Sequence, residues 1–234
     1  MLEQKAKPTI VDVKNVSRIF NYNGKHTIAV NNISLRSSYG ELLLILGPSG
    51  SGKTTLLTLI AGLIKPTSGN VFLFGNDIAL YSSKELQQLR AKQIGFVFQN
   101  FLLIDSFNVE ENISIVCRFA GLTCKQTRER TSQLLKQMHI EGLAKKYPPQ
   151  LSQGEKQRAA IARATVVSSE LIIADEPTAS LETNQGFEVI ELLHRYAIEE
   201  NKSVIVASHD LRLMKFTDKI LQIEDGKIKD MDIE

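Results

Sequence analysis

The stretch GPSGSGKT restricts what this chain can fold into more than any other feature. It spans Gly47–Thr54 and follows a continuously apolar run, Leu42–Leu46, which is typical of a strand buried in the middle of a sheet. Residues with helical spacing come next and end near Lys65 and Pro66. These pieces predict a strand, a glycine-rich loop and a helix, which together form one βα unit.

The loop fits the phosphate-binding pattern G-x-x-x-x-G-K-[ST]. Glycines let successive backbone N–H groups surround an anion, and the N-terminus of the following helix adds partial positive charge. In this pattern Lys53 reaches the β- and γ-phosphates, and the hydroxyl of Thr54 ligates Mg²⁺. A simple glycine-rich turn would not require all of these residues. The predicted phosphate-binding residues are Gly47, Pro48, Ser49, Gly50, Ser51, Gly52, Lys53, Thr54 and Thr55.

Three further polar residues follow apolar strand-like runs. Asp175 and Glu176 end the run LIIADE, where Asp175 can hold Mg²⁺ through water and Glu176 can orient and deprotonate an attacking water. Acidic residues at a strand end can also be solvated caps, but the upstream loop favours the catalytic interpretation. His209 follows SVIVAS, at the strand end where open α/β sheets bind ligands, and we expect it to contact the γ-phosphate. The pattern predicts a P-loop nucleoside triphosphatase.

Composition narrows the class further. The 234 residues are sufficient for one substantial core, and a formal net charge of +2 gives no electrostatic case for a nucleic-acid binder. No apolar run approaches the roughly 20 residues of a membrane helix, and the first residues lack the apolar core of a signal peptide. We therefore expect a cytoplasmic protein that reaches the membrane through a partner. Cys117 and Cys124 lack the spacing of a redox or zinc motif and are expected to be free thiols.

The stretch LSQGEKQRAAIARA, Leu151–Ala164, predicts a helix with a defined start. Ser152 and Glu155 form the capping-box pattern, in which each side chain binds the other residue's backbone N–H. The backbone donors at such a start also lie at the positive end of the helix dipole, which favours an anion. The stretch therefore predicts both a helix N-terminus and a candidate anion site.

A P-loop followed about a hundred residues later by L-S-x-G-[QE]-x-Q-R, and then by a strand ending in Asp-Glu, resembles the ATP-binding-cassette (ABC) ATPases. The resemblance covers essentially the whole chain. It implies an α/β fold with a P-loop NTPase (RecA-like) core sheet, an N-terminal antiparallel β part and an inserted helical subdomain. Residues 1–234 would form one domain, with the core at approximately 1–99 and 165–234 and the helical subdomain at approximately 100–164.

The resemblance also assigns roles to individual residues. Gln99, in VFQN, matches the Q-loop residue that links Mg²⁺ and γ-phosphate to the membrane partner; Ser180, in PTASLE, matches the D-loop; and His209 matches the switch histidine. Phe20 looks like the aromatic residue that stacks on adenine, with Tyr22 as the alternative. The catalytic set is then Glu176, His209 and Lys53. The Mg²⁺ set is Thr54, Gln99 and Asp175.

In this family two cassettes pack head to tail, so that the signature helix of one contacts the ATP held by the other. The signature residues here would be Ser152, Gln153, Gly154 and Glu155. The resemblance thus implies ATP and Mg²⁺ as ligands, a homodimer formed in ATP, and integral membrane permease subunits that hold the cassette at the cytoplasmic face of the cell (inner) membrane. No nucleic-acid partner is expected.

The motifs look most like cassettes of the lipoprotein-release, macrolide-export and heterocyst-exporter type. An ATPase of a cell-division complex without cargo remains an alternative. A soluble DNA-associated cassette is disfavoured because the chain has no long coiled-coil or zinc insertion between the P-loop and the signature. Two positions depart from the family pattern: Gln153 stands where the first glycine of the signature is usual, and Glu182 replaces the D-loop aspartate.

Overall fold

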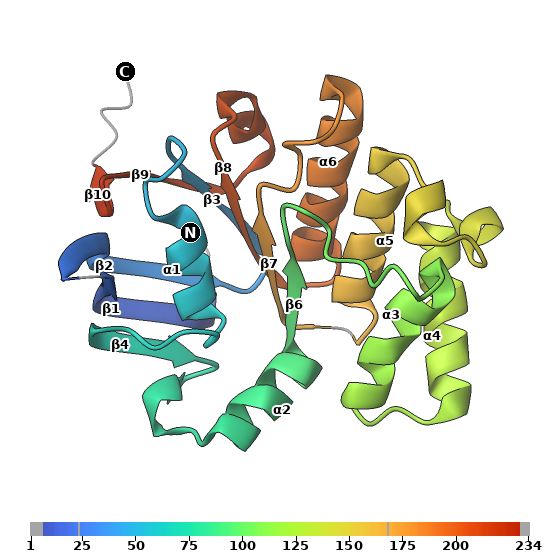
Figure 1. The fold of residues 1–234 in the computed structure, drawn as a ribbon, viewed down its shortest axis with the longest axis horizontal. Coiled ribbons are helices and arrows are strands. Elements are labelled where there is room, and N and C mark those ends of the chain that lie inside the picture. The colour runs from blue at the N-terminus through green and yellow to red at the C-terminus, as the bar shows by residue number, and fades with distance from the viewer. Residues whose placement is uncertain (1–6, 23, 168, 230–234) are drawn as a thin grey trace, which may run out of the picture. The chain divides into compact units, whose positions relative to one another are not determined.

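The computed structural model describes residues 7–22, 24–167 and 169–229. The chain forms two compact units: Met1–Tyr81 with Leu192–Glu234, and Ser82–Glu191 (Figure 1). The first unit therefore takes its parts from both ends of the chain, whereas the second is continuous. The sequence predicted one domain with a helical subdomain at 100–164, and this division stays a prediction.

An antiparallel sheet forms the N-terminal part of the first unit. Its strands are β1 (Thr9–Tyr22), β2 (Lys25–Ser38), β4 (Ser68–Leu73) and β5 (Asn76–Asp77), in the order β2-β1-β4-β5. Val11, Val13 and Val16 of β1 are buried because one face of the sheet packs on the core. The short helix Ile78–Leu80 follows, with the Asp77 side chain accepting from the backbone N–H of Ala79. The N-terminal β part is as predicted.

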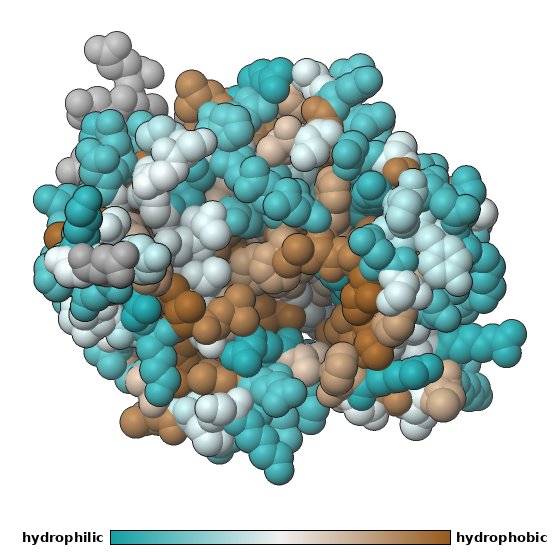
Figure 2. Space-filling view, viewed as in Figure 1, coloured by the Kyte–Doolittle hydropathy of each residue, from teal (hydrophilic) through white to brown (hydrophobic). Residues whose placement is uncertain are grey.

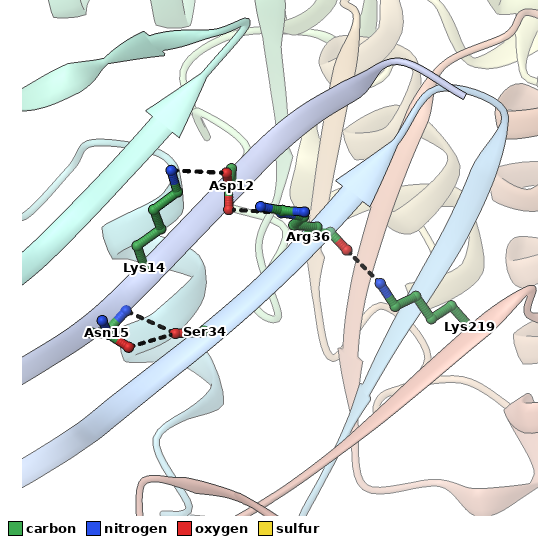
Figure 3. Close-up of polar contacts among 6 residues, drawn as sticks. All are labelled: Asp12, Lys14, Asn15, Ser34, Arg36 and Lys219. Atoms are coloured by element: carbon green, nitrogen blue, oxygen red, sulfur yellow. Dashed lines mark hydrogen bonds and ion pairs between the residues drawn. The ribbon is translucent and has the colours of Figure 1, made fainter. Parts of the chain in front are cut away.

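The outer face of this sheet carries polar cross-strand contacts (Figure 3). Asp12 of β1 stands opposite Arg36 of β2 in the register, and their side chains form an ion pair of 3.2 Å. Lys14 lies 3.5 Å from the other Asp12 oxygen, and Lys219 donates to the Arg36 carbonyl at 2.7 Å. Exposed ion pairs of this kind add little stability, but opposite charges placed face to face help to fix the register.

The second sheet of the first unit contains the predicted buried strand. The strands of this sheet that belong to the first unit are β3 (Glu41–Leu46), β8 (Ser203–Ser208), β9 (Lys219–Glu224) and β10 (Lys227–Lys229). β3 pairs in parallel with both β8 and β9, and β10 pairs antiparallel with β9. The β9–β10 turn is Asp225-Gly226, with φ of 48° and 72°, which is the positive-φ geometry that this dipeptide favours in hairpins.

Helix α1 (Lys53–Ile60) contacts strands of both sheets in this unit. Its residues Leu56, Leu57, Leu59 and Ile60 are fully buried. A hydrogen bond of 2.7 Å between the hydroxyls of Ser37 and Ser203, both fully buried, joins β2 to β8. The short helix Leu211–Phe216 follows β8. The P-loop is therefore fixed at both ends by buried elements.

The second unit is mainly helical. It contains the parallel pair β6 (Ile94–Val97) and β7 (Leu171–Asp175) and the helices α2 (Ser83–Gln93), α3 (Val109–Phe119), α4 (Cys124–Gln137) and α5 (Gln153–Thr165). Short helical turns at Glu141–Leu143 and Pro148–Gln150 precede α5, and α6 (Thr183–Glu199) leads back into the first unit. The apolar side chains of Leu134, Leu135 and Met138 are buried at the end of α4.

Helix α5 packs on β6, α3 and α4. A Cβ built on Gly95 of β6 would lie 2.1 Å from the carbonyl oxygen of Ala164, so the strand and the helix approach as closely as backbones can. Seen from the side shown in Figure 2, the surface mixes hydrophilic and hydrophobic groups. No helix in the described ranges has the length and hydropathy needed to span a bilayer.

Candidate nucleotide-binding site

The loop between β3 and α1 can be built only with glycine at its key positions. Gly52 has φ of 101°, and a Cβ there would lie 2.1 Å from the carbonyl oxygen of Ala29. A Cβ on Gly47 would lie 2.2 Å from the carbonyl oxygen of Ile223. The backbone of the loop is therefore pressed between β2 and β9. This close packing, together with the positive φ, explains the glycine pattern found in the sequence.

Lys53 lies at the start of α1 with its charged end turned back over the loop. Its side chain is 5% exposed, and Nζ donates to the carbonyl oxygens of Gly47 at 2.7 Å and Pro48 at 3.0 Å. The backbone N–H of Ser51 donates to Pro48 at 3.2 Å, and its carbonyl accepts from Gly226 at 3.0 Å. The ammonium is therefore fixed at the centre of the loop, as phosphate binding requires.

The Ser51 hydroxyl is the clearest sign that the loop takes a ligand. Ser51 is 3% exposed, and its Oγ has no hydrogen-bond partner within the described residues. A buried hydroxyl without a partner is costly, and a phosphate oxygen is an acceptor of the right kind. Pro48, Ser49 and Thr54 are exposed around it, and Thr55 is half-buried. The loop thus fits a phosphate group by shape and by donors.

His209 is fixed close to this loop through β8. The backbone N–H of Gly47 donates to the carbonyl oxygen of Ser208, the last residue of β8, at 3.2 Å, and His209 follows directly with its side chain exposed. The next residue, Asp210, accepts three hydrogen bonds from the Arg212 guanidinium at 2.8–3.1 Å. This guanidinium lowers the pKa of Asp210, so the turn after His209 is held by an ionised carboxylate.

Phe20 and Tyr22 lie near the end of β1, where the sequence placed the adenine contact. The Phe20 side chain is 39% exposed, and the guanidinium carbon of Arg18 lies 4.6 Å from its ring centroid. Tyr22 is 78% exposed. The Phe20 ring is thus ordered by a cation–π contact, whereas Tyr22 projects into solvent.

In the second unit, Asp175 and Glu176 lie at the end of β7. They are 5% and 8% exposed. Glu176 adopts a left-handed backbone with φ of 48°, and its carbonyl accepts from the backbone N–H of Ala179 at 3.2 Å. Left-handed residues other than glycine often occur at functional sites, because the surrounding structure must impose them. Ser180 and Glu182 are exposed on the following turn, and Gln99 is exposed after β6.

The signature residues form the predicted capping box at the start of α5. Ser152 is the N-cap: its backbone N–H donates to Glu155 at 2.7 Å, and its Oγ accepts from the Glu155 N–H at 3.3 Å. The bond from the Ser152 N–H lowers the pKa of the Glu155 carboxyl. Gln153 is the first helical residue and is exposed, and Gly154 is buried against the side chain of Gln185.

Three residues of α5 and α6 with notable contacts or burial were not predicted from the sequence. Gln157 is 1% exposed, and its Nε2 has no hydrogen-bond partner among the described residues. Gln185 of α6 lies against Gly154, and Arg163 of α5 binds the loop after β6. Only Arg163 left a sequence signal, a charged residue within the alanine-rich run AAIARA.

The family model for "ABC transporter" matches residues 30–179, well over half of the chain. The chain belongs to the ABC transporter family. Two curated relatives match nearly the full length of this cassette. HrtA of Staphylococcus aureus (strain MRSA252), whose name assigns it provisionally to hemin import as an ATP-binding protein, is 39% identical over 93% of this chain and 98% of its own. The lipoprotein-releasing system ATP-binding protein LolD of Buchnera aphidicola is 38% identical over 94% of this chain and 96% of its own.

Solved cassettes share the fold. The ATP-binding cassette MJ0796, solved as a dimer in a post-hydrolysis state bound to ADP and Pi, aligns with a TM-score of 0.89 at 35% identity, over 94% of this chain and 97% of that one. The cassette cbiO1 of Clostridium perfringens, part of the transporter complex cbiONQ, aligns with a TM-score of 0.84 at 31% identity, over 95% and 88%. The predicted fold class, an α/β P-loop NTPase with an antiparallel N-terminal sheet and helical parts, is confirmed. This ABC cassette is an ATP-binding, ATP-hydrolysing transporter subunit, and such cassettes form dimers and work with membrane permeases.

Proposed function

We propose that this cassette powers a transporter or mechanical complex of the export or lipoprotein-release type, as a homodimer that closes head to tail around ATP. The observation that carries the proposal is the start of α5. Ser152 and Gln153 are exposed there, and the helix N-terminus is already ordered by its capping box. An ordered helix start that faces solvent offers its backbone donors to an anion from outside its own chain.

The residue roles follow from the chemistry of the groups. Lys53 and the Ser51 hydroxyl bind phosphate oxygens, Glu176 orients and deprotonates the attacking water, and His209 contacts the γ-phosphate. Phe20 stacks on adenine. The signature residues contact the ATP of the second copy, and Ser180 lies on the D-loop beside them.

Mg²⁺ belongs to the same proposal. Thr54, Gln99 and Asp175 would hold it through a hydroxyl, an amide oxygen and a carboxylate, which are the oxygen donors that Mg²⁺ prefers. Within residues 7–22, 24–167 and 169–229 no three His, Cys, Asp or Glu side chains are grouped to hold a metal ion. The ion would neutralise charge on the phosphates. Chelation with EDTA should abolish hydrolysis and leave the fold intact by circular dichroism.

The dimer is tested with Glu176→Gln, which should retain ATP because hydrolysis is blocked. We expect light scattering to show a dimer in ATP and a monomer without it. The control Glu199→Gln removes an exposed carboxylate at the end of α6 and should not accumulate the dimer. Adding Ser152→Arg to Glu176→Gln should abolish dimerisation. A Glu176→Gln protein that stays monomeric in saturating ATP would overturn the head-to-tail proposal.

The proposed export or release direction rests on the similarity to LolD, a lipoprotein-release protein, whereas the name of HrtA points to import. Export and import are distinguished by co-purifying the membrane partner and measuring ATPase stimulation in liposomes. Release or efflux substrates should stimulate hydrolysis. Stimulation only by a substrate offered from the outer face would contradict the export assignment.

A further inference from the structure

The last turn of α5 contacts the loop that follows Gln99. Arg163 is half-buried, and its guanidinium donates two hydrogen bonds: from Nη1 to the carbonyl oxygen of Leu102 at 2.5 Å and from Nη2 to that of Phe101 at 2.7 Å. The acceptors belong to successive residues, and each is bound by a different terminal nitrogen. One side chain thus holds two adjacent peptide groups more than sixty positions away in the sequence.

Those two peptide groups have an unusual backbone. Phe101 and Leu102 have φ of 60° and 47°, so two consecutive residues with bulky side chains are left-handed. L-residues disfavour this conformation, and it persists only where the surroundings impose it. Within the loop, the N–H of Phe101 donates to Phe98 and that of Leu102 to Asn100, which are tight local turns. Arg163 supplies the long-range bonds that hold the kink.

Arginine suits this contact better than lysine would. Its guanidinium is planar and presents several N–H donors in a fixed fork, so two bonds form in one orientation. The backbone that carries the Arg163 side chain is fixed as well, because neighbouring Ala162 and Ala164 are buried and the backbone at Ala164 touches Gly95 of β6. Burial lowers the pKa of Arg163, but an arginine stays protonated at neutral pH.

We propose that Arg163 is a positioning residue that binds the loop following Gln99 to the signature helix, so that loop and helix move together. The inference rests on the proposed function, which gives Gln99 and Ser152 their roles in one ATPase cycle. In this role Arg163 acts through the loop and not on the nucleotide. It acts by transmitting a displacement of the Phe101–Leu102 backbone to α5, at whose other end the signature lies.

The contact itself is tested by hydrogen exchange on the protein without nucleotide. Arg163→Met keeps the length of the side chain and removes both donors. Exchange of the amides at residues 100–104 should rise at least about tenfold, because two charge-assisted bonds are lost. Arg163→Lys should give an intermediate rise. The control Arg128→Met, at an exposed arginine on α4, should match the wild type.

Exchange in α5 separates the proposed role from general stability. It should stay within about twofold of the wild type in Arg163→Met, because the helix keeps its packing on β6. An equal rise in the loop and throughout α5 would mean that Arg163 only stabilises the unit, and would overturn the proposal. Unchanged exchange at 100–104 would overturn it as well.

Steady-state kinetics test whether the Arg163 contact affects ATP hydrolysis. In Arg163→Met we expect kcat to fall at least about fivefold with the KM for ATP within about twofold, because positioning changes while nucleotide binding does not. Faster exchange at residues 100–104 together with a wild-type kcat would contradict the proposed coupling between the loop and α5. A wild-type protein without ATPase activity would refute the proposed function instead, and the exchange result would still decide whether Arg163 holds the loop.

Discussion

Gly154 and Gln185 meet so closely that a Cβ built on Gly154 would lie 2.9 Å from the side-chain oxygen of Gln185. Gly154 lies in the first turn of α5 and Gln185 in the first turn of α6. One turn further along, Arg158 and Glu188 form an ion pair of 3.9 Å. The two helices therefore touch at successive turns. Because α6 follows the turn that bears Ser180, this contact fixes the signature relative to the proposed D-loop.

Gly154→Ala should lower ATPase activity, and Gln185→Ala in the same chain should restore most of the loss. The added methyl would displace the tip of a flexible side chain, so we expect a stability cost below about 1 kcal/mol. The measurement is a double-mutant cycle in kcat/KM. Purely additive effects would mean that the glycine is required by something other than Gln185.

Gln153→Gly should leave ATPase activity equal or raise it. Gln153 is exposed as the first residue of α5, so its backbone is helical and needs no glycine. The side chain adds bulk at the surface where the second copy is proposed to close. Activity is compared by kcat in saturating ATP, with melting temperature as the control. A large loss of kcat without unfolding would show that Gln153 makes a useful contact.

Glu155→Gln should change how stability depends on pH. The pKa of Glu155 is lowered in the folded protein, so its carboxylate adds stability above the unfolded pKa of about 4.3 and loses it as pH falls further. The wild type should therefore exceed the variant in stability at pH 6–7, and the difference should shrink towards pH 3. Urea unfolding at several pH values measures it. If the stability difference between wild type and variant instead grew on acidification, the ionised Glu155 would not be the stabilising form in the capping box.

Gly95→Ala should destabilise the second unit by about 1–3 kcal/mol, because the new methyl would meet the backbone at Ala164 and not a movable side chain. Gly142 is the matched control: nothing lies within 4 Å of a Cβ built there. Gly142→Ala should stay within about 0.5 kcal/mol of the wild type. Equal effects of the two substitutions in urea unfolding would show that β6 and α5 can separate freely.

Phe20→Ala should raise the KM for ATP about tenfold, the effect expected for loss of one base–aromatic stack. Tyr22→Ala should change KM by less than about twofold. Phe20 is favoured because Arg18 orders its ring, whereas Tyr22 is largely exposed. GTP and ATP should be compared in both variants. A larger effect at Tyr22 would reverse the assignment.

Local signals carried most of what could be predicted. The strand before Gly47, the glycine loop, the capping box at Ser152 and the Asp225-Gly226 turn are each encoded by a few adjacent residues, and the structure contains all of them. The apolar run before Asp175 and Glu176 likewise predicted a strand that ends in two carboxylates, and the structure adds that both side chains are buried.

Contacts between distant segments could not be predicted in this way. Nothing near Phe101 signals two left-handed residues, because the bonds that impose them come from Arg163. Gly95 gives no indication of its neighbour until β6 and α5 are placed together, and Gln185 has no pattern that marks it as a neighbour of Gly154. Such positions depend on packing geometry, which local sequence does not specify.

The left-handed backbone at Glu176 sets stability against the proposed catalytic role of this residue. A residue with a Cβ pays about 1–2 kcal/mol for this conformation, which glycine or asparagine adopts more easily. Selection for stability alone would therefore replace the glutamate. The cassette keeps a residue that its own backbone disfavours. Given the proposed role of Glu176, we expect a screen for thermal resistance to select substitutions at position 176 that lack ATPase activity.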